Sequence, residues 1–361
     1  MRVQKILKGT RFIRSYILND LAVKYKIFFP KPLQVYWNIT DQCNFRCKMC
    51  DRWRKPIDKK SEVTDRLMKK VIDDLADWGI YKFGITGGEP FLRKNKALEV
   101  AHYAASKGLW VHIGTNASLV NEELINELDR VGLGHLSISI DGPREMHDSI
   151  RNFKGSFDRI LKVLELSKNA EFDIKINTVL SADTLDGIFK VIEIARTYSC
   201  PIFIQPYNPY NSEILAMHSQ KEISKRDSQW IPEDENAKLK YVVNNLIKLK
   251  KHEPTLLLNN LWHLKQMLNY FYKPFSQYYR CTTGYRNIHI APNGDIVPCW
   301  YFSKSVGNIK EKSIKEIWYS DSFDKIRKSM DKCKILCLSG CRFYPSPMQL
   351  IIVGVKKSIE R

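Results

Sequence analysis

The chain has 361 residues, of which 44% are hydrophobic and 27% charged, a balance typical of a globular protein with ample core. No apolar stretch approaches the length of a transmembrane helix and no secretory signal peptide is found, which argues against a membrane-spanning or secreted protein and predicts a cytoplasmic one. The formal net charge of +19 is compatible with nucleic acid, an anionic membrane surface or an acidic substrate as a partner, or with a lysine-rich composition that serves no partner.

The nine cysteines fall into two groups and one isolated residue. Three lie between residues 43 and 50, five lie between residues 281 and 341, and Cys200 stands alone before a predicted strand. In a protein that is not secreted, clustered cysteines indicate metal or redox sites more often than disulfides. We therefore expect two metal-binding regions, and a buried structural role for Cys200.

Residues 1–32 form a basic leader with eight lysine and arginine residues and one acid, Asp20. Its apolar residues recur at roughly helical spacing and predict an amphipathic helix: Ile6, Phe12, Ile13, Tyr16, Ile17 and Leu21. Such a helix either lies on an anionic membrane surface, which would make the protein membrane-peripheral, or packs against the following domain. We favour packing.

Residues 33–210 alternate between predicted strands and helices. The strands are predicted at Leu33–Thr40, Tyr81–Thr86, Trp110–Gly114, His135–Ile140, Phe172–Val179 and Pro201–Gln205. The helices are predicted at Thr64–Trp78, Lys94–Lys107, Asn121–Arg130, Ser156–Asn169 and Asp183–Ser199. Strands joined by helices through right-handed crossovers predict an α/β fold with a parallel sheet, open or curled into a partial barrel, and an active site at the carboxyl ends of the strands.

The rest of the chain is predicted to be a helical connector, a small cysteine-bearing module and a tail. Residues 211–275 carry leucine, isoleucine and valine at helical spacing, in Glu233–Lys251 and Leu256–Tyr272. In residues 276–345, an Asn-Gly turn signal predicts a hairpin of Asn287–Ala291 and Ile296–Pro298, and a helix near Ile314–Ser329 precedes three cysteines. Residues 346–361 form the tail.

The first cysteine group, Cys43-x3-Cys47-x2-Cys50, directly follows the first predicted strand. Three thiols are one fewer than the four ligands that a structural zinc or most iron–sulfur clusters take from the protein. A four-iron cluster on three thiolates would leave one iron open to a substrate or cofactor, whereas a zinc knuckle would need a fourth ligand from elsewhere. The stretch resembles the Cx3Cx2C motif of the radical S-adenosylmethionine (SAM) enzymes.

Two further strand ends resemble motifs of that superfamily. Gly87-Gly88-Glu89-Pro90, after the second strand, matches the GGEP motif, with which the family binds the amino group of SAM. Paired glycines allow the backbone to approach a ligand closely, and a carboxylate accepts hydrogen bonds from an ammonium group. Thr115-Asn116, after the third strand, matches a Thr-Asn element at the same face.

The SAM carboxylate and adenine also have predicted partners. Ser139 and, twelve residues later, Arg151 resemble the serine and arginine that hold the carboxylate in this family, a task that suits the bidentate guanidinium group. The residue before the third cysteine is usually aromatic and lies against the adenine. Here it is Met49, whose side chain fills the same apolar role.

The C-terminal module resembles the SPASM/twitch extension, which carries auxiliary iron–sulfur clusters. The opening pattern is Cys281-x12-Gly294-x4-Cys299, and Cys337-x3-Cys341 matches the closing pair. A full two-cluster module has seven cysteines, and five cannot close two four-iron clusters. The resemblance therefore implies one auxiliary 4Fe–4S cluster, held by Cys281, Cys299, Cys341 and either Cys333 or Cys337, with a zinc ribbon on the same ligands as the alternative.

The resemblance spans residues 35–345 and implies a partial (β/α)6 barrel, the radical SAM core, at residues 33–210. It implies SAM and two 4Fe–4S clusters as cofactors, a reductant such as flavodoxin or ferredoxin, and abstraction of a hydrogen atom from a small molecule or peptide. The leading hypothesis is an oxidoreductase whose auxiliary cluster accepts an electron. Some SPASM enzymes carry a general base just after the second module cysteine, but Trp300 stands there in this chain, so no catalytic acid or base is assigned.

Two alternatives stay open at the level of sequence. One is a redox-neutral epimerase in which a spare thiol, Cys333 or Cys337, returns a hydrogen atom. The other, from a different class, is a zinc protein that binds nucleic acid through its basic surface. A zinc protein that binds nucleic acid would have no use for the GGEP segment, Ser139 and Arg151, so nucleic acid is not expected as a partner.

Overall fold

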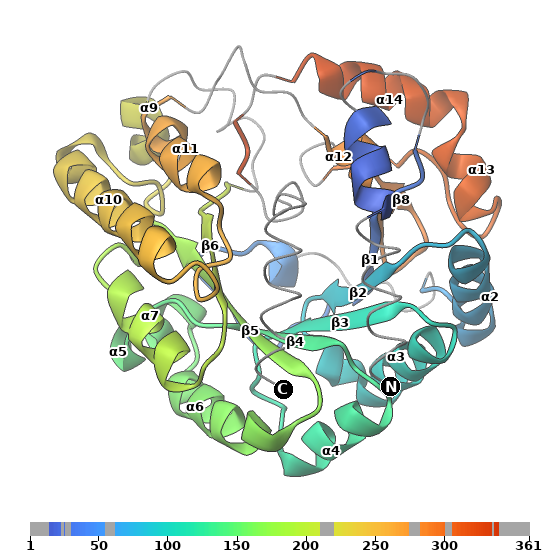
Figure 1. The fold of residues 1–361 in the computed structure, drawn as a ribbon, viewed down its shortest axis with the longest axis horizontal. Coiled ribbons are helices and arrows are strands. Elements are labelled where there is room, and N and C mark those ends of the chain that lie inside the picture. The colour runs from blue at the N-terminus through green and yellow to red at the C-terminus, as the bar shows by residue number, and fades with distance from the viewer. Residues whose placement is uncertain are drawn as a thin grey trace.

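The computed structural model describes residues 14–22, 25, 30–54, 62–209, 220–273, 282–299, 305–333 and 336–338. These residues form one curved sheet with helices along its outer side (Figure 1). The strand order is β6-β5-β4-β3-β2-β1-β7-β8. Every neighbouring pair from β6 to β7 is parallel, and β8 is antiparallel to β7.

All six predicted core strands are present, and each end lies within one residue of its predicted position. The core strands are β1 (Gln34–Thr40), β2 (Lys82–Gly87), β3 (Trp110–Thr115), β4 (His135–Ser139), β5 (Asp173–Leu180) and β6 (Ile202–Pro206). The C-terminal module adds β7 (Asn287–Ile290) and β8 (Ile296–Val297). The predicted parallel α/β fold is therefore confirmed, as is the hairpin of the C-terminal module.

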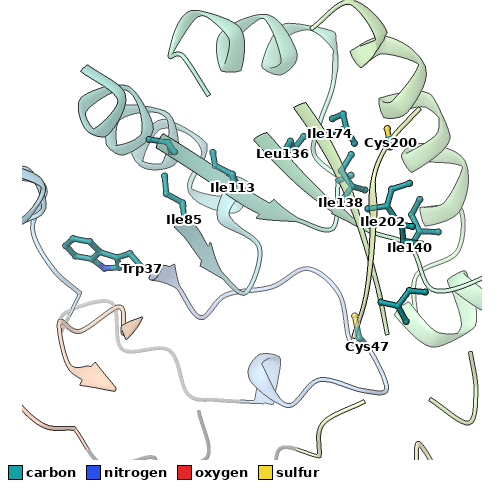
Figure 2. Close-up of a cluster of buried hydrophobic side chains, with 14 of the residues drawn as sticks. Trp37, Cys47, Ile85, Ile113, Leu136, Ile138, Ile140, Ile174, Cys200 and Ile202 are labelled. Carbon is teal, nitrogen blue, oxygen red and sulfur yellow. The ribbon is translucent and has the colours of Figure 1, made fainter. Parts of the chain in front are cut away.

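Alternation of apolar and polar residues along the strands gives the sheet an apolar face toward the helices and a more polar inner face. Ile85, Ile113 and Ile138 are fully buried on the side of the sheet that faces the helices (Figure 2). Successive side chains of a strand point to opposite faces, so the residues next to them in sequence belong to the other face. Burying each such side chain stabilises the fold by about 1.5–3 kcal/mol. Cys200 joins this core, as predicted, and burial raises the pKa of its thiol to about 12.

The helices also follow the predicted pattern closely. They are α2 (Asp65–Asp77), α3 (Lys94–Ser106), α4 (Glu122–Arg130), α5 (Arg144–Arg151), α6 (Ser156–Leu166), α7 (Ile188–Thr197), α9 (Gln220–Arg226), α10 (Asn236–His252), α11 (Leu261–Tyr272), α12 (Thr283–Arg286), α13 (Ile314–Trp318) and α14 (Asp321–Asp331), with four short 3-10 turns, η1 (Arg52–Arg54), η3 (Pro90–Arg93), η4 (Ser167–Asn169) and η5 (Glu233–Glu235). The predicted N-cap is confirmed at Asn121, whose side chain accepts a hydrogen bond from the Leu124 amide.

Three predicted helices differ from the structure, each for a local reason. The helix from Asp183 begins only at Ile188, because Thr184 and Ser181 hold the preceding residues in a hydrogen-bonded turn. The helix from Leu256 begins at Leu261, because residues 256–259 pair with the edge of β6 instead. The helix near Ile314–Ser329 is split into α13 and α14, since Ser320 caps a new helix. Helix α5 was not predicted at all.

The C-terminal module continues the sheet of the core. Strand β7 lies parallel to β1, with Tyr36 opposite His289 and Trp37 opposite Ile290. In Figure 1 helices α12–α14 accordingly lie beside β1, while α9–α11 lie at the opposite end, beside β6. Segments about 250 residues apart in sequence thus share backbone hydrogen bonds.

The described part of the leader, residues 14–22, is helical and packs against this module, in agreement with the packing that we favour. Asn19 donates hydrogen bonds to the carbonyl oxygens of Tyr285 (2.9 Å) and Lys31 (3.2 Å), and Asp20 pairs with Arg286. Tyr16 is buried against Leu33. Among the helices of the described stretches, none has the length and apolar character needed to cross a bilayer.

Replacing Asn19 with alanine is expected to lower the free energy of unfolding by about 1–2 kcal/mol, because two carbonyl oxygens lose a donor in a site where Asn19 is only 1% exposed. Chemical denaturation measures the change. The matched control is Leu18→Ala on the same helix, whose side chain is 45% exposed and whose loss should cost less than about 0.5 kcal/mol. Equal effects of the two substitutions would mean that the leader does not pack in this way.

Candidate functional site

The Cys43–Cys50 loop begins at the carboxyl end of β1 and is held against helix α5. Phe45, in the middle of the loop, is 1% exposed and its ring stacks on Phe153, with 4.5 Å between centroids. The Lys48 amide donates to the carbonyl oxygen of Ile150 in α5 (2.9 Å). Figure 2 shows Cys47 on the side of the sheet toward which the strand arrows point, as the sequence predicts.

The three thiols have the chemistry of iron–sulfur ligands. Burial raises the pKa of Cys43 to about 11 and raises that of Cys47, so a bound metal must displace their protons. The Phe45 amide donates to Cys43 Sγ (3.4 Å), the kind of donor that stabilises a thiolate. Within the described stretches, no three histidine, cysteine, aspartate or glutamate side chains lie close enough together to hold one metal ion. Three cysteines on one loop are the ligands that a four-iron cluster with one open iron would take from the protein.

The paired glycines of the GGEP segment let β2 approach the backbone of the cysteine loop. The Gly88 amide donates to the Thr40 carbonyl (2.8 Å), and the Glu89 amide donates to the Gln42 carbonyl (2.7 Å). A Cβ atom on Gly88 would lie 1.9 Å from the carbonyl oxygen of Gln42, and one on Gly87 would lie 2.2 Å from that of Thr40. The close approach expected of these glycines is therefore made to the cysteine loop itself.

Glu89 connects the ends of β2 and β3. Its side chain is fully buried and accepts hydrogen bonds from Thr115 Oγ1 (2.8 Å) and the amides of Asn116 (2.8 Å) and Phe91 (3.1 Å). Burial raises the pKa of this carboxyl to about 7, against the lowering effect of these donors. The structure thus brings together three predicted site residues, Glu89, Thr115 and Asn116, through the chain's own hydrogen bonds.

Asn116 also contacts the cysteine loop. Its side-chain nitrogen donates to Asn44 Oδ1 (2.9 Å), and Asn44 in turn donates to Ser118 Oγ (2.8 Å). Sequence reasoning did not select Asn44 or Ser118. The position of Asn44 between two cysteines was the available signal for it.

Arg151 lies between the cysteine loop and the end of β4. Its Nε and Nη2 atoms bind Asp141 Oδ2 (2.6 and 2.5 Å), and Nη1 lies 3.9 Å from Cys47 Sγ. Burial alone would lower the pKa of Arg151, but Asp141 beside it holds the pKa above its ordinary value. Asp141, which sequence reasoning missed, is fully buried and also accepts from the Val179 amide (2.9 Å), so it fixes Arg151 to both β4 and β5.

Ser139 and Met49 lie at the same edge of the sheet as Arg151. Ser139 is the last residue of β4 and is paired in register with Asn177 of β5. Met49 is 7% exposed and belongs to the core cluster that includes Cys47. Their contacts with the cofactor stay predictions.

A row of imidazole and phenol side chains crosses the inner face of the sheet and was also missed. Tyr36, Gly84, His112 and His135 lie opposite one another on β1–β4, and His289 of β7 lies opposite Tyr36. Ring centroids are 5.2 Å apart between Tyr36 and His289 and 4.8 Å apart between His112 and His135, both pairs stacked. The alternation of polar and apolar residues along these strands was the signal for this row.

Two of the five predicted auxiliary ligands, Cys281 and Cys341, lie outside the described residues. Cys299 follows β8 and is buried beside Met330. Cys333 lies two residues beyond the end of helix α14 and is partly exposed, whereas Cys337 is 1% exposed. The choice between Cys333 and Cys337 stays a prediction at this point.

Comparison with known proteins agrees with this geometry. The family model of the radical SAM superfamily matches residues 37–193, and that of the SPASM iron–sulfur cluster-binding domain matches residues 281–342. The chain is similar to an AdoMet-dependent heme synthase of Methanosarcina barkeri, strain Fusaro (27% identity, 86% of this chain and 91% of the relative), and to a PqqA peptide cyclase of Rhizobium meliloti, strain 1021 (23%, 86% and 82%).

The fold is similar to that of Streptococcus suis SuiB bound to S-adenosylmethionine, with a TM-score of 0.65 at 17% identity, over 85% of this chain and 70% of that one. The two domains imply SAM, a radical SAM 4Fe–4S cluster and an auxiliary cluster as the cofactors. The two domain matches also argue against the alternative of a zinc protein that binds nucleic acid. The chain belongs to the radical SAM superfamily and carries a C-terminal SPASM domain.

Proposed function

We propose that the protein uses SAM to abstract a hydrogen atom from its substrate and that its auxiliary cluster then accepts an electron, so that the net reaction is an oxidation. When bound on Cys43, Cys47 and Cys50, the cluster supplies the electron that cleaves SAM and releases the 5′-deoxyadenosyl radical. The observation that carries the proposal is the convergence of three motifs, distant in sequence, on the cysteine loop: Gly87–Glu89, Thr115–Asn116 and Arg151.

The chain's own residues orient SAM and the cluster loop. Gly88 and Glu89 fix the loop to β2, Asn116 fixes it to β3 through Asn44, and Thr115 holds the Glu89 carboxylate. Arg151 presents Nη1, the nitrogen that Asp141 does not engage, on the Cys47 side. We assign this atom, together with Ser139, to the SAM carboxylate, since a guanidinium group pairs well with a carboxylate.

The substrate and the net redox change are the finer part of the proposal. The relatives include a heme synthase and a peptide cyclase, so both a small molecule and a peptide agree with the family. A redox-neutral epimerase is the second candidate, because a five-cysteine module leaves one thiol to spare. Solvent deuterium at the substrate carbon would distinguish epimerisation from oxidation.

Two further parts of the proposal concern partners. A flavodoxin or ferredoxin supplies the electron that the radical SAM cluster needs. The outer side of the leader helix exposes Ile17, Leu18 and Leu21 at 40–45%. In a chain of net charge +19, this face suits contact with an anionic membrane surface, and the inner side packs against the domain.

Anaerobic reconstitution is expected to load about eight irons per chain, in two four-iron clusters. Replacing Cys43, Cys47 and Cys50 together with alanine should reduce this number to about four, because the auxiliary ligands stay in place. Iron and acid-labile sulfide are measured on the same samples. A wild-type plateau near four irons would contradict the auxiliary cluster.

A further inference from the structure

Asp141, two residues beyond the end of β4, is fixed through both its side chain and its main chain. Its Oδ2 binds Nε and Nη2 of Arg151 (2.6 and 2.5 Å), and its Oδ1 accepts from the Val179 amide (2.9 Å). Its own amide donates to Nδ1 of His147 (3.1 Å). Asp141 is fully buried. Its carboxylate therefore has one orientation, in which it covers one edge of the Arg151 guanidinium group.

The covered edge determines which atom of Arg151 is left for a ligand. A guanidinium group pairs most strongly with a carboxylate through two N–H groups on one edge, and Asp141 already holds the edge of Nε and Nη2. Nη1 is left, and its one contact among the described residues is Cys47 Sγ, at 3.9 Å. A carboxylate that binds Nη1 is thereby brought to the cysteine loop.

His147 lies in α5, one turn before Arg151, and is fully buried. Because the Asp141 amide must donate, His147 Nδ1 is the acceptor and the ring proton lies on Nε2. Burial and the nearby Arg151 lower the pKa of His147 to about 4, so the ring is neutral at pH 7. Its buried Nε2 has no hydrogen-bond partner among the described residues.

The unpaired nitrogen argues against a role of His147 in stability alone. A buried donor without an acceptor destabilises a fold, and a leucine side chain would fill the same space without that penalty. The acceptor at Nδ1 is what an apolar side chain could not supply. It fixes the main chain of Asp141, and through Asp141 the guanidinium group of Arg151.

We propose that Asp141 and His147 are positioning residues for SAM, which hold Arg151 so that Nη1 receives the SAM carboxylate beside the cysteine loop. The inference rests on the proposed function, because it requires SAM at Arg151. It deepens that function by naming the residues that determine which edge of the guanidinium group is open to SAM. Both act through Arg151.

The role of Asp141 is tested by the Kd of SAM, measured by equilibrium dialysis on the anaerobically reconstituted full chain. Asp141→Asn keeps the size of the side chain but removes the charge that holds Arg151, so the Kd should rise at least about tenfold. The matched control is Asp148→Asn on the same helix. The Asp148 carboxylate accepts from the amides of Gly155 (2.5 Å) and Phe157 (2.9 Å) and serves the start of α6.

The control should lower thermal stability and leave the Kd of SAM within about twofold of wild type. A wild-type Kd in Asp141→Asn, at wild-type iron content, would overturn the proposal while the cleavage of SAM still supports the proposed function. A wild-type chain that holds its clusters but binds no SAM would instead end the proposed function itself.

His147 is tested by two substitutions of opposite design. His147→Asn places a side-chain oxygen near the position of Nδ1, where it can accept from the Asp141 amide, and should keep the wild-type Kd of SAM. His147→Leu fills the space without an acceptor and should raise the Kd at least about fivefold. The change that SAM causes in the EPR spectrum of the reduced cluster should be retained in His147→Asn and altered in His147→Leu. A merely structural role would lower thermal stability and leave the Kd and the spectrum alike in both variants, which would overturn the role of His147.

Discussion

Replacing Cys43, Cys47 and Cys50 with alanine is expected to reduce the cleavage of SAM to the background measured without protein. The thiols are the only protein ligands proposed for the cluster that supplies the electron. The measurement is the amount of 5′-deoxyadenosine formed under strong reductant by the anaerobically reconstituted protein. Continued cleavage would end the central claim of the proposed function.

The matched control for this experiment is Cys200→Ala. Cys200 is buried like Cys47, and it lies in the core between the sheet and the helices, away from the cysteine loop. Its replacement removes one small side-chain atom and should cost about 1 kcal/mol of stability while the cleavage of SAM is retained. A loss of cleavage in both variants would point to unfolding and not to the loss of cluster ligands.

Gly88→Ala is expected to be the most damaging single substitution outside the cysteines. Its Cβ would lie 1.9 Å from the oxygen and 2.4 Å from the carbon of the Gln42 carbonyl, and backbone atoms cannot turn aside as the end of a side chain can. The GGEP segment would have to move away from the cysteine loop and lose its bonds to Thr40 and Gln42. We expect a loss of about 2–3 kcal/mol in unfolding free energy and about a hundredfold in SAM cleavage.

Gly114→Ala is the matched control. Gly114 lies in β3, next to the same edge of the sheet, but a Cβ there would meet only Thr86 Cγ2, at an ordinary 3.8 Å. We expect a change of less than about 1 kcal/mol in stability and near wild-type cleavage. Chemical denaturation and 5′-deoxyadenosine formation, measured on both variants, test whether the glycine pair positions the cysteine loop. If Gly88→Ala behaves like Gly114→Ala, the glycine pair does not position the loop.

Local patterns in the sequence determined the strands and most helices of the core. All six barrel strands lie within one residue of their predicted bounds, and the predicted side-chain cap at Asn121 marks the start of α4. The motif residues also lie where the sequence placed them, at carboxyl ends of parallel strands, because that position follows from strand order alone.

Helix α5 is an instructive miss. Its eight residues are mostly polar, with only His147 and Ile150 buried, so no apolar periodicity marks it. Tertiary contacts fix it instead: Ile150 receives the Lys48 amide of the cysteine loop, and Arg151 at its end binds Asp141. Arg151 was identified from the sequence as a site residue, but the helix that carries it was not predicted.

The sequence by itself determined the barrel strands, the cysteine motifs and the candidate residues for SAM, because each depends on spacing within a few residues. The tertiary structure decided which groups these residues meet: Gly88 approaches the cysteine loop, Glu89 joins β2 to β3, and β7 extends the sheet beside β1. These contacts join segments up to about 250 residues apart, and no local propensity encodes such a pairing. They form because the shared sheet brings these distant segments together, and groups such as the Glu89 carboxylate then find their hydrogen-bond partners across it.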